Sequence, residues 1–374
     1  DDDDSFFYDL CVDRLGREMR VLERILAAAK GEEVDKVPVA LVAYSQVLKS
    51  VHGVNEYEYL HSLDLQLEAK VEFIKMFPEV WNPLIGMPEC GHGWAIPVAF
   101  GAKLVWFEDR PPFIEGYPIK EPEDVDRIIE AGMPDPREVG VSKVFLEGLR
   151  YFTKRFPRDL MEEYGYVEGI MDPEILVEGA ALAMGYDKFL IWMRKYPETV
   201  HKWLRFATEF HIRYCEAIEE VIGKPRIFFL PDHMASMVSK KYFEEFVLPY
   251  LNKLFNRYPK ALKIWHNEGC VKHMLDAIDK LKADVWQCGP GDDPVRVKEE
   301  THLAAWGNIH PPWIVGATPS QVEEECKKLI LRAAPGGRFW LGTGGGMAPG
   351  TSPWHIRAFI RAVEKYGVYP IGEG

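Results

Sequence analysis

The hydrophobic residues of this chain gather into short unbroken runs, which alternate with longer segments of helical periodicity. The runs are rich in Val, Ile, Leu, Phe and Trp, and they do not alternate with polar residues, which is typical of strands covered on both faces. Eight runs fit this description: Val37–Ala43, Val80–Ile85, Tyr166–Met171, Arg226–Leu230, Ala261–Trp265, Asp284–Gln287, Leu303–Trp306 and Arg338–Leu341.

The segments between these runs carry signals for helix starts and ends. Helices are predicted over Pro197–Val221, Ser239–Asn256 and Pro319–Leu331, the last of them after an N-cap residue, Thr318. Alternating strands and helices indicate parallel strands joined by right-handed crossovers. Eight such units predict a (β/α)8 TIM barrel. An open doubly wound sheet is the alternative, but no GxGxxG follows the first strand.

Three segments do not fit the simple repeat. Lys103–Glu108 lies in an insertion after the second strand and is predicted to be an extra strand that returns over the barrel mouth. Glu121–Tyr151 is helical in pattern, and Leu10–Lys30 is a long amphipathic helix expected to cap the barrel or pack on its side. We predict one domain over residues 1–374, with residues 1–30 as an N-terminal helical extension.

Composition and charge exclude several classes of partner. The net charge of -13 opposes non-specific nucleic-acid binding, which needs a basic face. No apolar run approaches the ~20 residues of a membrane span, and the acidic start of the chain is unlike a signal peptide. The six cysteines form no CxxC pair, which indicates a reducing compartment. We therefore expect a cytoplasmic protein with neither nucleic acid nor a membrane as partner.

The active site of such a barrel lies at the carboxyl ends of its strands. After the fifth strand, His266 and Glu268 are two residues apart and therefore project from the same face of an extended segment. An imidazole and a carboxylate placed in this way can share a zinc ion or act as a base and its orienting partner. Cys270 is a third metal-ligand candidate if the strand continues. The alternative is a structural hydrogen bond between His266 and Glu268.

Other strand ends supply further candidates. Glu89 and His92 follow the second strand, and glycines beside them allow the chain to turn. Asp232 and His233 follow the fourth strand, and one of the two is expected to face the mouth. We predict Glu89 and Asp232 as catalytic carboxylates, and His233 and Asn308 as substrate-binding residues. The sequence contains no serine nucleophile elbow, Walker loop or HExxH motif.

The C-terminal third carries a family resemblance. Trp306–Pro311 and Gly316–Pro319 resemble the GNIDP…GTP segment of the uroporphyrinogen decarboxylase superfamily. Gly342–Pro353 resembles the last strand and the start of the final helix of that family, and Phe243–Tyr250 (FEEFVLPY) resembles its fourth-helix signature. The resemblance extends loosely over residues 20–368.

This superfamily contains two chemistries. Its decarboxylases bind substrate carboxylates through arginines just after the first strand, whereas Val37–Val47 contains no arginine; Arg110 is the one obvious cationic candidate. Its zinc methyltransferases act with corrinoid proteins and carry His-x-Cys after the fifth strand and a further Cys at the eighth. His266 matches the first of these ligands, Glu268 replaces the first Cys, and Gly345 or a neighbour replaces the second.

The resemblance therefore implies a methyltransferase. A His/Glu site is harder than a thiolate site and suits polarising an ether, such as a methoxy compound, so that its methyl group can pass to a corrinoid. The implied cofactors are zinc and a corrinoid supplied by a partner protein, and Tyr44 and Trp94 would hold the small methyl donor. The remaining ligand would come from Glu89, His92, Asp232 or Cys270. Family members are often dimeric, so a homodimer is a further expectation.

Two other functions are compatible with the sequence. A carboxy-lyase of the uroporphyrinogen decarboxylase type would need cationic side chains at the mouth. A metal-free binding barrel would need neither a metal nor a corrinoid.

Overall fold

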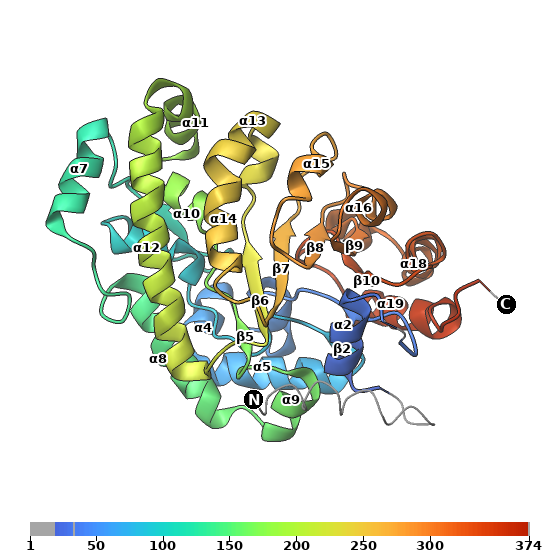
Figure 1. Cartoon of the computed structure of the whole chain (residues 1–374). Helices are drawn as coiled ribbons and strands as arrows, with labels where there is room; N and C mark the ends of the chain where they lie inside the picture. Colours follow the sequence, from blue (N-terminus) through green and yellow to red (C-terminus); the bar gives the residue numbers. More distant parts are fainter. Residues whose placement is uncertain (1–18, 33, 373–374) are drawn as a thin grey trace, which may run out of the picture.

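Eight parallel strands form a single curled sheet in the computed structural model, which describes residues 19–32 and 34–372 (Figure 1). Their order is β2-β1-β10-β9-β8-β7-β6-β5. The strands are β1 (Val39–Ala40), β2 (Val80–Trp81), β5 (Ile170–Met171), β6 (Ile227–Pro231), β7 (Leu262–Asn267), β8 (Val285–Cys288), β9 (Ala304–Ile309) and β10 (Phe339–Thr343). Each coincides with a predicted run, so the predicted TIM-barrel class is confirmed.

Side chains, rather than a strand ladder, join the two ends of the sheet. Within the described ranges no backbone pairing connects β2 with β5. Instead, the indole Nε1 of Trp81 donates to the carbonyl oxygen of Tyr164 at 3.1 Å. The backbone N–H of Asn82 donates to the hydroxyl oxygen of Tyr166 at 2.9 Å. We refer to this junction as the seam.

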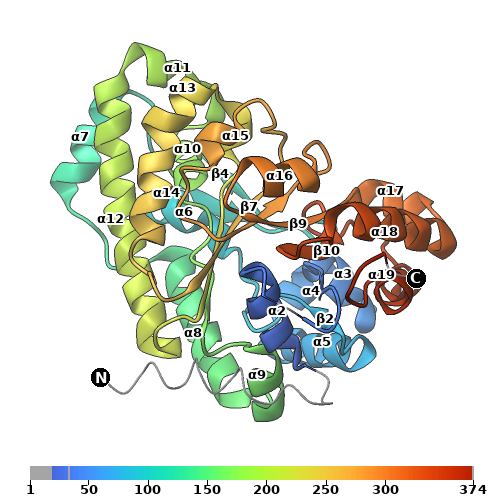
Figure 2. The same ribbon diagram turned by 45° about the vertical axis from the view of Figure 1, so that its right-hand side comes forward.

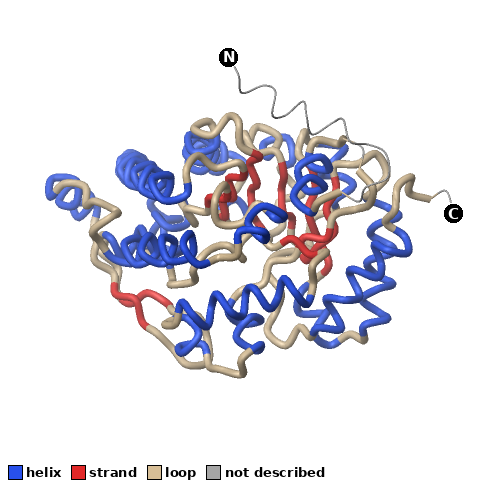
Figure 3. Tube along the Cα trace, turned by 90° about the horizontal axis from the view of Figure 1, so that it is seen from below, coloured by secondary structure: helices blue, strands red, loops and turns tan. Residues whose placement is uncertain are grey.

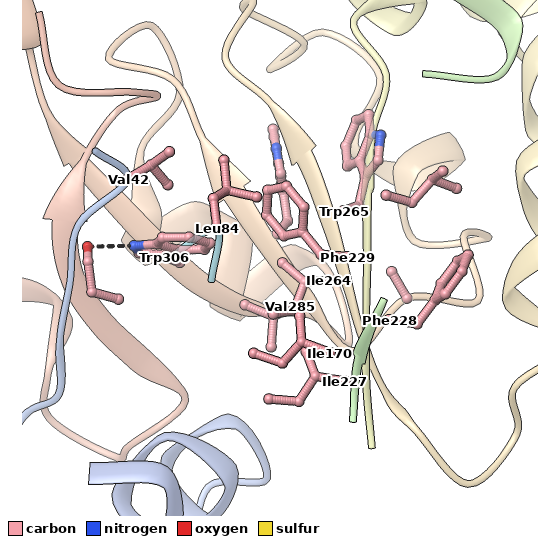
Figure 4. Packing of buried hydrophobic residues seen from close by; sticks show 14 of the residues in the cluster. Val42, Leu84, Ile170, Ile227, Phe228, Phe229, Ile264, Trp265, Val285 and Trp306 are labelled. Carbon is pink, nitrogen blue, oxygen red and sulfur yellow. Dashed lines mark hydrogen bonds between the residues drawn. The ribbon is translucent and has the colours of Figure 1, made fainter. Parts of the chain in front are cut away.

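The barrel interior is filled in layers. Ile170, Ile227, Ile264 and Val285 come from four successive strands and point toward one another (Figure 4). All four are buried, which explains why the strand runs are continuously apolar. Nearer the β1 side, Trp306 donates its indole N–H to the carbonyl oxygen of Ala40 at 2.9 Å.

Helices surround the strands on the outside (Figures 1 and 2). The helices are α2 (Val21–Ala29), α3 (Ser45–Leu48), α4 (Glu56–Leu60), α5 (Leu63–Met76), α6 (Ala95–Ala99), α7 (Pro122–Ala131), α8 (Gly140–Arg155), α9 (Arg158–Tyr164), α10 (Val177–Leu182), α11 (Tyr186–Lys195), α12 (Pro197–Ile222), α13 (Lys240–Tyr242), α14 (Leu248–Phe255), α15 (Leu275–Ile278), α16 (Pro294–Glu300), α17 (Pro311–Gly316), α18 (Pro319–Ala333) and α19 (Pro353–Tyr366). In the described part of the chain, no helix is both long and apolar enough to cross a membrane.

Two of the three predicted helices are continuous. Helices α12 and α18 match the predictions, and the hydroxyl of Thr318 caps α18 as expected. The predicted helix Ser239–Asn256 is instead divided into α13, a π-helical turn over Phe243–Val247, and α14. The turn precedes Pro249, which has no N–H to donate and crowds the carbonyl group one turn back, so the backbone widens there.

The irregular segments differ in part from their predictions. Glu121–Tyr151 contains two helices, α7 and α8, and the first ends at Gly132, whose φ of 90° no helix accommodates. Pro134 and Pro136 follow, and each disfavours helical backbone angles at the residue before it, so the chain stays extended there. Of the predicted helix Leu10–Lys30, residues 10–18 lie outside the described residues, and the rest forms α2, which packs against α9, β2 and β10.

The predicted extra strand is one half of a hairpin. Strand β3 (Lys103–Val105) pairs in antiparallel fashion with β4 (Phe113–Glu115), which the sequence patterns did not reveal. Figure 3 shows this hairpin apart from the strands of the barrel. The indole Nε1 of Trp94 donates to the carbonyl oxygen of Pro112 at 3.1 Å, which ties the loop after β2 to the hairpin.

Candidate metal centre

Four side chains form the next layer of the barrel toward the carboxyl ends of the strands. Asp172, Phe229, His266 and Gln287 each lie two residues beyond a member of the apolar layer, and alternate residues of an extended chain face the same way. The ring centroids of Phe229 and His266 are 5.9 Å apart. Along strands β5 to β8, an apolar layer is thus followed, toward the carboxyl ends, by a layer that contains a carboxyl group, an imidazole and an amide.

Gln287 determines which nitrogen of His266 is available. The Nε2 of Gln287 donates to the carbonyl oxygens of Thr343 and Gly345 at 3.3 and 3.2 Å. Its Oε1 therefore faces His266 and accepts a hydrogen bond from Nδ1 at 2.6 Å. With the proton on Nδ1, Nε2 keeps its lone pair for a metal ion. Burial and the neighbouring His233 lower the pKa of His266 to about 3, so the imidazole is neutral.

Glu178 plays the same part for His233. The Nδ1–H of His233 donates to Oε2 of Glu178 at 2.7 Å, and Oε1 of Glu178 accepts a hydrogen bond from the Tyr186 hydroxyl at 2.6 Å. Burial opposes a charge on His233, but the hydrogen bond that it donates to Glu178 and the negative charge of Glu178 raise the pKa of His233 to about 9. Nε2 of His233 is buried and has no hydrogen-bond partner. A carboxylate hydrogen-bonded to the far nitrogen of an imidazole is the usual arrangement behind a metal ligand, and a metal ion bound at Nε2 of His233 would displace the proton from that nitrogen.

Glu268 completes a group that can hold a metal ion. One ligand atom from each of His233, His266 and Glu268 lies within 4.8 Å of the others. The two imidazole rings are 5.0 Å apart and nearly perpendicular, at 88°. Two imidazoles and one carboxylate form the donor set of catalytic zinc sites with an open coordination position, and the same set suits other divalent transition metals. The orphaned Nε2 of His233 fits such an ion.

Gly345 leaves the space that Glu268 occupies. A Cβ atom at Gly345 would lie 1.8 Å from Oε2 of Glu268, and the φ of Gly345 is 118°, which other residues rarely adopt. The residue at position 345 therefore has to be glycine for Glu268 to keep its place. The two departures from the methyltransferase pattern, at positions 268 and 345, thus lie in contact with each other.

Cys270, which was one of the candidates for a third ligand, lies outside this group of candidate ligands. Its exposed thiol donates to the carbonyl oxygen of Gly291 at 3.3 Å. His233, predicted to bind substrate, takes the third place. Strand alternation carries the signal that sequence reasoning missed, because His233 is two residues beyond Pro231 and four beyond the inward-facing Phe229.

Asp232 is fully buried and faces backbone rather than the ligand group. Its Oδ2 accepts hydrogen bonds from the N–H groups of Val177 and Glu178 at 2.7 and 3.0 Å, at the start of α10. Its Oδ1 accepts one from the N–H of Met234 at 3.1 Å. Burial and the charge of Glu178 raise the pKa of Asp232 to about 7, although the hydrogen bonds from the N–H groups of Glu178 and Met234 lower it. The carboxyl therefore fixes α10, which carries Glu178, relative to β6.

Glu89 is likewise engaged in holding loops. Its Oε1 forms an ion pair with the fully buried Lys70 at 3.1 Å, and its Oε2 accepts a hydrogen bond from the N–H of Ser45 at 2.7 Å. The Tyr59 hydroxyl donates to Oε1 at 3.3 Å. These contacts fix the start of α3, immediately after Tyr44. The side chain of His92, the other candidate in this loop, lies outside the described residues.

Tyr44 lies at the mouth among carboxyl groups. A Cβ atom at Gly346 would lie 2.4 Å from Cε2 of Tyr44, so the ring is packed against the loop after β10. Burial and four carboxyl groups raise the pKa of Tyr44 well above its ordinary range, which keeps the phenol protonated. The four groups belong to Glu174, Asp172, Glu268 and Glu89.

Trp94 and Asn308 are also committed to neighbouring segments. Trp94 packs edge-on against Phe113 of the hairpin, with ring centroids 5.0 Å apart. The side-chain amide of Asn308 donates to the carbonyl oxygens of Gly289 and Asp292 at 2.8 and 2.6 Å. Both side chains therefore shape loops at the mouth.

Asp172 and Glu174 were not predicted from the sequence. Asp172 directly follows β5 and is 1 % exposed. Its Oδ1 accepts a hydrogen bond from the N–H of Glu174 at 2.7 Å, whereas its Oδ2 is buried without a hydrogen-bond partner. Burial and the charge of Glu174 raise the pKa of Asp172 well above its ordinary range, which favours the protonated form of this carboxyl group. Burial raises the pKa of Glu174 to about 7.

The fold and the site together define a class: a (β/α)8 barrel with two imidazoles and a carboxylate gathered at the carboxyl ends of its strands. The chain belongs to the uroporphyrinogen decarboxylase (URO-D) family, whose pattern it matches over residues 21–366. The resemblance drawn from the motifs is therefore confirmed.

Individual relatives fall into two groups. A uroporphyrinogen decarboxylase from Schizosaccharomyces pombe is 25% identical, over 92% of this chain and 97% of the relative. A methylated-thiol--coenzyme M methyltransferase from Methanosarcina mazei is 27% identical, over 93% of this chain and 90% of the relative. Among solved structures, a methyltransferase from Methanosarcina mazei superposes with a TM-score of 0.76 at 22% identity, and the match covers 93% of this chain and 99% of that one.

Proposed function

We propose that this protein transfers a methyl group from a small methyl donor, such as a methoxy compound, to a corrinoid carried by a partner protein. The observation that carries the proposal is the group of His233, His266 and Glu268, with one ligand atom of each within 4.8 Å of the others. Similarity to the coenzyme M methyltransferase of Methanosarcina mazei supports the same reaction class.

The residues of this chain have definable roles in such a reaction. A zinc ion bound by the three side chains would act as a Lewis acid toward the heteroatom that carries the methyl group. Gln287 and Glu178 orient the two imidazoles so that each presents Nε2 to the same point. Tyr44, a protonated phenol in contact with the loop after β10, can donate a hydrogen bond to the donor molecule.

The charges around the site favour this reaction over decarboxylation of a polycarboxylate. Among the residues described around the group, Lys70 is buried and already paired with Glu89 and the carbonyl oxygen of Leu84. Arg110 is exposed and lies over the ring of Phe107, 4.1 Å from its centroid. A substrate with many carboxylates would meet Glu174, Glu178 and Glu268, and of the described cations neither Lys70 nor Arg110 is placed to balance its charge.

Metal content and methyl transfer test the proposal. Protein purified without chelator should contain about one divalent metal ion per chain, and His266→Ala should lose it, while the exposed His273→Ala should keep it. With free cob(I)alamin and methoxyarenes, the wild type should form methylcob(III)alamin, which absorbance distinguishes from cob(I)alamin. Metal-free wild type that yields no methylcobalamin, or that decarboxylates uroporphyrinogen instead, would refute it.

A further inference from the structure

The layer that contains His266 also contains a carboxyl group with an unused oxygen. Asp172 follows the inward-facing Ile170 by two residues, as His266 follows Ile264 (Figure 4). Oδ2 of Asp172 is buried and has no hydrogen-bond partner, although buried polar atoms nearly always have one. An unpartnered oxygen on the interior face of a barrel strand, at the mouth, indicates an atom whose partner is a ligand.

The surroundings of Asp172 fix its orientation. The N–H of Glu174 donates a hydrogen bond to Oδ1 of Asp172, so Oδ2 is the oxygen that remains available to a ligand. Glu174 holds this position with a left-handed φ of 65°, and its carbonyl oxygen accepts a hydrogen bond from Nε2 of the buried His211 at 3.2 Å. A non-glycine residue in that region is strained, and such strain gathers at functional sites.

The groups near Asp172 keep a proton on it. Glu174 is the charged neighbour on its own segment, Tyr44 faces it from the loop after β1, and Tyr214 faces it from α12. None of these is a cation, and two carboxyl groups this close cannot both ionise in a dry site. Oδ2 is therefore a hydroxyl donor rather than a carboxylate acceptor.

We propose that Oδ2–H of Asp172 protonates the leaving oxygen of the methyl donor, which makes Asp172 the general acid of the reaction proposed above, on which this inference rests. The carbon–oxygen bond breaks and its electron pair stays on oxygen. The electron pair of the Co(I) corrinoid forms the new cobalt–carbon bond, and the proton of Asp172 goes to the oxygen, so that an alcohol or phenol leaves.

The proposal selects a class of methyl donor. An ether releases an alkoxide or phenolate, a base that a general acid helps to expel. A quaternary ammonium or sulfonium donor releases a neutral amine or thioether, which needs no proton. Asp172 therefore favours neutral oxygen ethers with a basic leaving group.

A series of ring-substituted anisoles with free cob(I)alamin tests this role. Asp172→Asn keeps the acceptor for the N–H of Glu174 but cannot transfer a proton. We expect it to slow demethylation of anisole about 10²- to 10⁴-fold, and 4-nitroanisole, which releases a weaker base, far less. The dependence of the rate on the pKa of the leaving phenol should become steeper. Asp284→Asn, on the opposite end of the barrel, is the matched control.

Infrared spectroscopy tests Asp172 independently of turnover. The wild type at pH 7 should show the C=O band of a protonated carboxyl that is missing in Asp172→Asn, and the product phenol should shift that band. An equal loss of rate across the anisole series, or no such band, would overturn the inference while leaving methyl transfer intact. A wild type that is inactive toward every donor would instead contradict the proposed function. The carboxyl band and its shift with phenol would still show whether Asp172 is protonated and whether it contacts the phenol.

Discussion

Nδ1 of His266 and Oε1 of Gln287 lie 2.6 Å apart across the neighbouring strands β7 and β8. The amide of Gln287 cannot turn over, because its nitrogen donates to the carbonyl groups of Thr343, the last residue of β10, and of Gly345 in the loop that follows. The position of the proton on His266 is therefore set by three strands together. Gln287 therefore orients the candidate ligand His266 without being a candidate ligand itself.

Replacing Gln287 should weaken metal binding without removing a ligand. Gln287→Leu removes the acceptor that holds the proton on Nδ1, and loss of such a partner typically costs 10- to 100-fold in metal affinity, a range of about one to three kcal/mol. Competition with a chromophoric chelator measures the dissociation constant. Gln321→Ala, which alters only the cap of α18, should retain the wild-type value. Equal affinity in Gln287→Leu and wild type would show that His266 does not depend on this contact.

Cys270 should be dispensable for the metal. Its thiol points at the carbonyl oxygen of Gly291, outside the group formed by His233, His266 and Glu268. We expect Cys270→Ser to bind one metal ion per chain with unchanged affinity, and His233→Ala to lose it. Elemental analysis measures the metal content of both variants. Loss of metal in Cys270→Ser would contradict the prediction and would identify the thiol of Cys270 as a ligand.

Gly345 should be essential although it offers no side chain. In Gly345→Ala the new methyl group would meet Oε2 of Glu268, so Glu268 must leave its place and metal content should fall. Gly316→Ala is the matched control, because a Cβ atom there has no neighbour within 4 Å. The double variant Gly345→Ala/Glu268→Ala should bind no less metal than Glu268→Ala alone, and a further loss would contradict the steric explanation.

Stability should fall in acid through His211. Burial lowers the pKa of this histidine to about 4, whereas its unfolded value is near 6.5, so the unfolded chain binds the proton more readily. The contribution of neutral His211 is present above pH 6.5 and is lost as the pH falls toward 4, by about 3 kcal/mol in total. Urea denaturation at pH 7 and 4 measures the free energy of unfolding, which should fall less between the two pH values in His211→Gln than in the wild type. Equal falls in both proteins would contradict the assignment to His211.

The sequence predicted the barrel because the strand runs are continuous and the helices have clear ends. It predicted His266 and Glu268 for a similar reason, since their spacing alone places them on one face. Cys270 was expected to continue that face, but the chain leaves the strand geometry after Asn267. The end of α7 at Gly132 and the π-helical turn before Pro249 arise from a glycine and a proline, which the periodicity of the hydrophobic residues does not register.

The supporting carboxyl groups were harder to predict. Asp172 and Glu174 lie in a segment without a motif, and their importance comes from burial, from an unpartnered oxygen and from a left-handed backbone. Glu89 was expected to react, yet its charge is balanced by Lys70, which lies on α5 and not at a strand end. The ion pair between Lys70 and Glu89 depends on how α5 packs beside the loop after β2, which the sequence pattern alone does not reveal.

The seam between β2 and β5 is the one junction of the described ring of strands that no backbone ladder spans. Elsewhere around the ring, changing the width would break a ladder of backbone hydrogen bonds, as between β6 and β7. At the seam, two hydrogen bonds, from the indole of Trp81 and to the hydroxyl of Tyr166, bear the closure. Asp172 is on one flank of the seam, whereas β7 and β8 lie away from it. The proposed acid Asp172 therefore lies beside a junction that side-chain contacts hold, whereas His266 and Gln287 lie on two strands whose register is fixed by a backbone ladder.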